Sequence, residues 1–116
     1  MPEQKPPRPD RAPARQGELE TLERPKVARP PLYEVLIHND DYTTQEFVVF
    51  ILQKFFHHDG TTARQIMLHV HTKGIGVAGV FTYDVAETKV HLVTEFARQN
   101  EMPLKVTMRR QPGGEE

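Results

Sequence analysis

Residues 33–47 read YEVLIHNDDYTTQEF, and they place a strand-like run, a polar cluster and a helix start side by side. The run at 33–37 is mostly apolar and partly β-branched, which is typical of a strand. The polar cluster after it ends the strand. Thr43 and Glu46 then have the spacing of a capping box just before Phe47, which predicts that a helix begins there. This stretch therefore predicts a strand that turns directly into a helix.

Further along the chain, the hydrophobic pattern predicts two more helices and two more strands. The predicted elements are a first helix ending at about Phe56, a helix capped by Thr61 or Thr62, a strand over 77–81, a helix from Thr82 to Asn100 and a strand over 104–109. The order is β-α-α-β-α-β. It predicts an α+β fold, a two-layer sandwich in which three helices pack on one face of a three-stranded antiparallel sheet.

Composition limits the classes of function. The chain has 116 residues, enough for one small domain, and its 15 basic and 16 acidic side chains give a net charge of -1. This balance gives no general electrostatic reason to bind nucleic acid or an anionic membrane. The absence of cysteine excludes disulfides, thiolate zinc sites and cysteine nucleophiles. No apolar run reaches the length of a membrane span or resembles a signal peptide, so we expect a cytoplasmic protein.

Prolines divide the chain into unequal parts. Eight of the 10 prolines fall within residues 1–31, which carry few large apolar side chains. Such a segment buries too little surface to offset its chain entropy, so we expect a disordered, Pro-rich N-terminal arm over 1–31. The folded domain is expected over 32–110, and residues 111–116 are expected to form a disordered tail.

The run Gly74 to Gly79 matches the pattern G-x-G-x-x-G. That pattern binds a dinucleotide only where it follows a strand and opens a helix. Here a predicted helix precedes it and a predicted strand follows it. We therefore interpret the run as a helix C-cap followed by a tight connection, and we expect no nucleotide cofactor.

Histidines and carboxylates suggest one enzymatic alternative. A small metal-dependent hydrolase would use His57, His58 and His71 together with Asp40 or Asp41. However, no H-E-x-x-H or comparable ligand spacing is present, so we expect no bound metal. A further alternative is a protein-interaction domain that does not recognise protein N-termini.

The polar cluster itself indicates a binding site. If Thr43 and Glu46 cap the helix, then Asn39, Asp40 and Asp41 remain without a structural role. Their oxygens lie at the end of a predicted strand, opposite a predicted helix that carries Met67 and His71. Carboxylates repel a phosphate, whereas acceptors beside an apolar surface suit an amine with a hydrophobic neighbour.

The chain resembles the ClpS family, adaptors that deliver N-degron substrates to the Clp protease. The stretches that carry the resemblance are YEVLIHNDDYTTQEFV, LQKFF, MLHVHTKGIGVAGVFTYDVAETKV and NEMPLKVTMRR, and they cover nearly all of residues 32–110. The resemblance implies a fold like the C-terminal domain of the ribosomal stalk protein. It also implies a binding module without catalysis, whose ligand is a protein that begins with Leu, Phe, Tyr or Trp.

The resemblance also implies roles for single residues. Asn39 and His71 would bind the free α-amino group, with Asp40 assisting, and His71 would accept through a bare ring nitrogen. The residues that would line the side-chain pocket or meet the peptide backbone are Asp41, Thr43, Gln45, Val48, Met67, Val70 and Leu104. Many family members have a methionine where this chain has Gln45, so the preference among first residues remains open here.

Two residues of the long helix correspond to the family's docking positions. Asp84 and Lys89 would contact the N-terminal domain of a ClpA or ClpC unfoldase, and their alternative role is that of solvated helix side chains. The Pro-rich arm would help to hand the substrate over. The simplest state for such an adaptor is a monomer.

Overall fold

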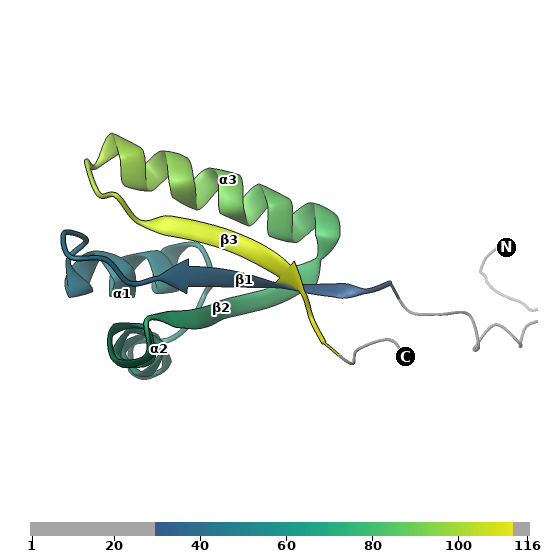
Figure 1. Cartoon of the computed structure of the whole chain (residues 1–116), viewed down its shortest axis with the longest axis horizontal. Helices are drawn as coiled ribbons and strands as arrows, with labels where there is room; N and C mark the ends of the chain where they lie inside the picture. The colour runs from purple at the N-terminus through teal and green to yellow at the C-terminus, as the bar shows by residue number, and fades with distance from the viewer. Residues whose placement is uncertain (1–29, 113–116) are drawn as a thin grey trace, which may run out of the picture.

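The computed structural model describes residues 30–112 (Figure 1). Its elements are β1 Leu32–His38, α1 Gln45–Lys54, α2 Gly60–Lys73, β2 Ile75–Thr82, α3 Tyr83–Gln99 and β3 Lys105–Arg110. The predicted order β-α-α-β-α-β is confirmed. The expected arm lies outside the described residues up to position 29, and the expected tail lies outside them from 113 onward, so both remain predictions.

The sheet has β1 at its centre. The strand order is β2-β1-β3, and β1 pairs antiparallel with both neighbours. Val35 and Ile37 of β1 are fully buried and belong to one core cluster with side chains from all three helices. Since successive strand residues point to opposite faces, the helices cover the face that carries Val35 and Ile37. The predicted two-layer sandwich is therefore confirmed.

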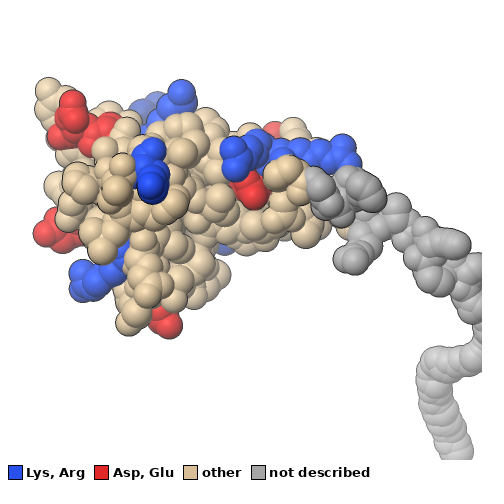
Figure 2. All heavy atoms as spheres, turned by 60° about the horizontal axis from the view of Figure 1, so that its bottom comes forward, with Lys and Arg blue, Asp and Glu red and all other residues tan. Residues whose placement is uncertain are grey.

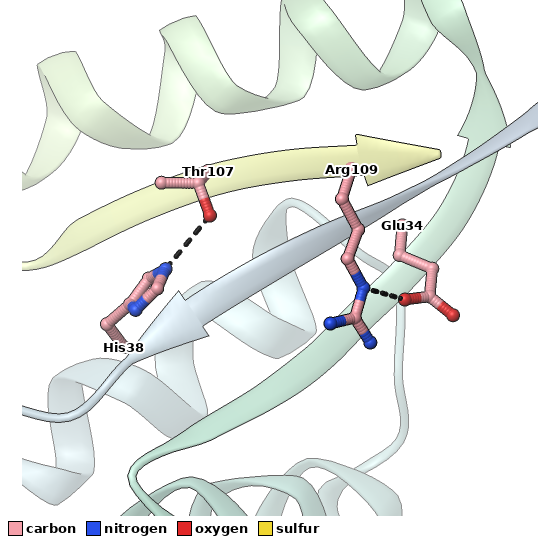
Figure 3. A network of polar contacts seen from close by, with 4 residues as sticks. All are labelled: Glu34, His38, Thr107 and Arg109. Atoms are coloured by element: carbon pink, nitrogen blue, oxygen red, sulfur yellow. Dashed lines mark hydrogen bonds and ion pairs between the residues drawn. The ribbon is translucent and has the colours of Figure 1, made fainter. Parts of the chain in front are cut away.

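Polar pairs join the strands on the other face of the sheet (Figure 3). The Nε of Arg109 donates to Glu34 at 2.7 Å, and His38 shares a 2.9 Å hydrogen bond with Thr107. Leu36 lies between these pairs along β1 and is only 5% exposed. Burial, and then the positive charge of Lys105, lowers the pKa of His38, which favours its neutral form. This open face is thus held by cross-strand pairs of β1 and β3.

The first helix is capped one residue later than predicted. The hydroxyl of Thr44, not that of Thr43, accepts from the backbone N–H of Phe47 at 3.1 Å. Thr43 instead donates both its N–H and its hydroxyl to the carboxylate of Asp40, each at 2.7 Å. The predicted capping box of Thr43 and Glu46 is therefore wrong, because the helix begins at Gln45 and the Thr43 side chain contacts Asp40 instead.

The second helix also starts earlier than predicted. Asp59 is its N-cap and accepts from the N–H of Thr62 at 2.7 Å, so neither Thr61 nor Thr62 is the cap. A carboxylate at this position also interacts favourably with the positive end of the helix dipole.

The glycines of the G-x-G-x-x-G run have structural roles at two positions. Gly74 ends α2 with a left-handed φ of 92°, and its carbonyl accepts from the N–H of Asn39 at 2.9 Å. A Cβ on Gly76 would lie 2.7 Å from a methyl group of Val70, so this glycine allows α2 and β2 to pack closely. The helix C-cap is confirmed at Gly74, whereas the expected connection is absent, because β2 begins directly at Ile75.

An aromatic seam joins α1 to α3. Phe96 stacks on Phe47 and Phe50 and meets Phe55 edge-on, with ring centroids 5.3–5.8 Å apart. Beside the seam, the ammonium of Lys89 donates to the carbonyl of Phe55 at 2.6 Å. This carbonyl belongs to the C-terminal end of α1, where a cation is favourable.

Charged side chains are scattered over the face of the molecule that Figure 2 shows. Figure 2 shows one face of the molecule, on which acidic and basic side chains surround a broad uncharged centre, and no continuous basic band crosses it. Basic side chains gather toward the end at which the described part of the chain stops, where Arg109 and Arg110 finish β3. Within residues 30–112, none of the helices combines the length and apolar character that crossing a bilayer requires.

The backbone conformation of Gly74 gives a first prediction. Gly74→Ala should lower the free energy of unfolding by about 1 kcal/mol or more, because a Cβ is disfavoured at positive φ. A Cβ there would meet no atom within 4 Å, so the loss would report backbone strain alone. Urea denaturation followed by circular dichroism measures it.

The matched control is Gly60→Ala in the first turn of the same helix. The new Cβ would make only an ordinary 3.7 Å contact with Gln53. Alanine restricts the unfolded chain, so this variant should be neutral or more stable by up to about 1 kcal/mol. Equal losses in both variants would contradict the role assigned to Gly74.

Candidate binding site

A cavity of about 380 Å³ lies where β1 ends and α1 and α2 face each other. It is lined by Asn39, Asp40, Asp41, Tyr42, Thr43, Thr44, Gln45, Val48, Met67, Val70 and His71. The structure thus brings together nine of the ten residues expected to form the binding pocket. The tenth, Leu104, lines a neighbouring cavity.

The cavity has a polar mouth and an apolar floor. Val48, Met67 and Val70 are each at most 7% exposed and belong to the hydrophobic core. Asn39 and His71 are exposed at the mouth. A ligand can therefore bury an apolar group against the core while a polar group stays at the surface.

A backbone hydrogen bond brings the two sides of the mouth together. Asn39 follows β1, and its N–H donates to the carbonyl of Gly74, the residue that ends α2. His71 lies in the last turn of α2, one turn before Gly74. The strand end and the helix end are thus tied to each other, and Asn39 and His71 face one cavity.

Asp40 organises the loop that carries the mouth. One oxygen of its carboxylate accepts from the N–H groups of Tyr42 at 2.8 Å and Thr43 at 2.7 Å, and the other accepts from the Thr43 hydroxyl. Burial raises the pKa of this carboxyl, but the hydrogen bonds from Thr43 and Tyr42 outweigh burial and lower its pKa below the ordinary value. Asp40 is therefore ionised at neutral pH.

Acceptors remain for a cation. The hydroxyl-bonded oxygen of Asp40 keeps a free lone pair, since a carboxylate oxygen can accept twice. The side chains of Asn39 and His71 take no part in the Asp40 network. An amide oxygen, an imidazole nitrogen and a carboxylate at one mouth form a suitable site for an ammonium group.

Sequence reasoning missed Tyr42. It is 80% exposed although it is aromatic, and it lines both this cavity and the neighbouring one. Its backbone N–H is held by Asp40, which keeps the turn in place. The available signal was an aromatic residue in the middle of a polar turn, where burial is not expected.

The two expected docking residues lie on α3. Asp84 is exposed in the first turn of the helix. Lys89 is half-buried, donates to the Phe55 carbonyl and lies 5.7–5.9 Å from the ring centres of Phe81 and Phe56. Lys89 thus already has a structural role within the domain.

The histidines of the hydrolase hypothesis are not assembled. His58 hydrogen-bonds to the carbonyl of Ala78 at 2.6 Å and, like His57, does not line the cavity that holds His71. Among residues 30–112, three or more His, Cys, Asp or Glu side chains never come close enough together to hold a metal ion. The metal-hydrolase alternative is therefore not supported, because His57 and His58 lie away from the cavity that His71 shares with Asp40 and Asp41.

The charge of Asp40 gives a prediction about pH. A pKa lowered by folding stabilises the protein above the unfolded value of about 3.9, and this contribution is lost as pH falls through the folded pKa. Asp40→Asn should therefore cost about 1–2 kcal/mol at pH 7, from weakened hydrogen bonds to a charged group. The difference from the parent protein should shrink below about pH 4.

Urea unfolding of both proteins at pH 7 and pH 3 measures this. The conservative change Asp41→Asn is the control, because Asp41 is exposed and lies outside the hydrogen-bond network of Asp40. A difference between Asp40→Asn and the parent that is the same at both pH values would show that the charge does not stabilise the loop.

Comparison with known proteins shows the family to which the chain is similar. Residues 28–107 match the family described as ATP-dependent Clp protease adaptor protein ClpS. The ClpS adapter protein of Myxococcus xanthus is 55% identical over 94 residues, which are 81% of this chain and 88% of that protein. The ClpS adapter protein of Alkalilimnicola ehrlichii is 60% identical over 85 residues, which are 73% of this chain and 80% of that protein.

A solved structure shares the fold. It is that of Agrobacterium tumefaciens ClpS2 bound to L-phenylalaninamide. The match has a TM-score of 0.69 at 37% sequence identity and covers 72% of this chain and 100% of that one.

Proposed function

The chain belongs to the ClpS family, the adaptors of the ATP-dependent Clp protease, and from that premise we propose that it captures proteins by a bulky apolar N-terminal residue. The observation that supports this is the cavity with buried Val48, Met67 and Val70 beneath Asn39 and His71. L-phenylalaninamide, bound by the related Agrobacterium protein, combines a free α-amine with an apolar side chain. The cavity offers a complementary surface to each of these groups.

The α-amine distinguishes an N-terminus from any internal residue. In the proposed complex, Asn39 and His71 accept hydrogen bonds from the ammonium, and the negative charge of Asp40 favours its binding. The side chain of the substrate's first residue packs against the apolar floor of the cavity. Asp41 and Thr43 lie beside the substrate backbone. An acetylated N-terminus has neither the charge nor the donors, so it leaves these acceptors unpaired.

Side-chain shape selects among N-termini. Leu, Phe, Tyr and Trp can extend into the cavity, whereas Val and Ile place a second carbon close to the backbone, where the walls are nearest. Gln45 lines the mouth of the cavity and begins α1. The ClpS family often has a methionine at this position. The polar side chain of Gln45 would therefore change the preference of this chain among N-terminal residues.

Delivery follows capture. We propose that the adaptor works in the cytoplasm and has no catalytic activity of its own. We assign its contact with a ClpA- or ClpC-type unfoldase to α3, around Asp84 and Lys89. Asp84 is exposed and lies outside both cavities, so a partner can contact it without displacing the substrate.

Capture is tested by fluorescence anisotropy with labelled peptides that differ only in their first residue. A Leu-initiated peptide should bind with a free amine and fail to bind when acetylated. Asn39→Ala or His71→Ala should weaken binding at least about 30-fold, because an ammonium without its acceptor costs about 2 kcal/mol or more.

The control for His71→Ala is His69→Ala, the same change at an exposed position of the same helix that does not line the cavity. It should leave the affinity unchanged. If both histidine variants behave alike, or if acetylation has no effect, the assignment of the amine site is wrong.

Docking is tested with Asp84→Lys and the isolated N-terminal domain of ClpA or ClpC. Calorimetry should show at least about a 10-fold loss of affinity, because a favourable charge contact becomes repulsive. The affinity for the Leu-initiated peptide should be unchanged. Lys89 is less suitable for this test, since its amine also binds the Phe55 carbonyl.

The matched control is Glu95→Lys, with the same charge change on the same helix about 16 Å further along. It should bind the unfoldase domain as the parent protein does. Normal binding by Asp84→Lys would remove this residue from the docking surface.

A further inference from the structure

A second and larger cavity, of about 520 Å³, lies on the other side of Tyr42. It is lined by Tyr42, Thr94, Arg98, Glu101, Met102, Pro103 and Leu104. Its walls thus come from the loop after β1, the last turns of α3 and the segment between α3 and β3. The proposed capture of the first residue does not use this space.

Residues 101–103 form the lip of the second cavity, and backbone hydrogen bonds fix their conformation. Glu101 has a left-handed φ of 61°, its N–H donates to the carbonyl of Arg98, and the N–H of Met102 donates to that of Ala97. This pair of hydrogen bonds is a Schellman motif, which ends α3 and directs Met102 and Pro103 along the cavity. The lip is therefore a preformed surface rather than a loose linker.

The lining has a definite chemical character. Met102, Pro103 and Leu104 supply an apolar surface, and methionine adapts to side chains of different shape. Arg98 and Glu101 supply one charge of each sign, and Arg98 is also paired with Glu95. The cavity therefore suits an apolar side chain, and its charged residues do not favour a ligand of either sign.

Tyr42 connects the two cavities. It is part of the lining of both, and its backbone N–H is held by the Asp40 carboxylate that also borders the proposed amine site. A substrate whose first residue fills the first cavity must continue outward past its mouth. The loop that carries Tyr42 is one side of that mouth, and beyond it the surface is hollowed again.

We propose that the second cavity is a subsite for a large apolar side chain of the same substrate, downstream of its first residue. This inference rests on the proposed function, since it takes the first residue to be held at the amine site. To extend past the Tyr42 side chain, the substrate needs roughly two residues of extended backbone at about 3.3 Å each. The subsite therefore lies at position three or four of the substrate. The adaptor then reads two apolar residues rather than one.

The experiment uses the full chain and labelled peptides that begin with Leu and otherwise contain Ala. A single Phe replaces Ala at position 2, 3, 4 or 5. Phe at position 3 or 4 should raise the affinity about 5- to 10-fold over the all-Ala peptide, as expected for an aromatic ring partly removed from water. Fluorescence anisotropy measures each peptide.

Thr94→Trp fills the second cavity from α3 and should abolish the gain from Phe, leaving the all-Ala peptide unaffected. Leucinamide, which has no downstream residue, should compete equally well for both proteins. The control is Thr88→Trp, the same change at an exposed position of α3 that does not line the cavity. It should keep the gain.

The outcomes separate the two proposals. If the peptides need a free amine but no position of Phe improves binding, the subsite is overturned and capture stands. If the gain persists in Thr94→Trp, the ring binds elsewhere and the subsite is again overturned. If binding does not need the free amine at all, the proposed capture fails and the subsite fails with it.

Discussion

The arrangement of the site depends on one backbone constraint, the antiparallel pairing of β1 with β2. Because the two strands run in opposite directions, the end of β1 lies beside the start of β2, with His38 opposite Ile75. The pairing is extended by the hydrogen bond from Asn39 to Gly74, where α2 ends. Two segments more than thirty residues apart in the chain thus meet at one place, and the amide of Asn39 comes to the same cavity as the imidazole of His71.

Much of the fold could be predicted from local patterns. The strand over 33–37 and the helix with Met67 and Val70 on its buried face follow from hydrophobic periodicity, and both are present. The caps were harder, since Thr43 and Thr44 are both adequate caps by spacing. In the structure the cap is Thr44, because the helix begins at Gln45 and the Thr43 hydroxyl donates to Asp40, a tertiary contact that a spacing rule does not contain.

The site was also predictable in part, because most of its residues lie in short, local sequence segments. Nine of the ten expected pocket residues come from two segments whose spacing matches a known family, and they line one cavity. Tyr42 and the second cavity were not predicted, because that cavity forms only when the loop after β1, the end of α3 and residues 101–104 are assembled. Lys89 shows a further limit of prediction from sequence. It was expected to contact a partner, but within the domain its ammonium donates to the Phe55 carbonyl.

The central position of β1 gives the domain two opposite poles. The candidate cavity lies at the His38 end of a strand of 7 residues, and at its other end Leu32 accepts a hydrogen bond from Gln111. Both ends of the described chain therefore leave together (Figure 1), separated from the cavity by about 20 Å of strand. A force applied through either end of the described chain would therefore act at the pole opposite a bound substrate. A partner that held the domain at this pole would leave the mouth of the candidate cavity uncovered.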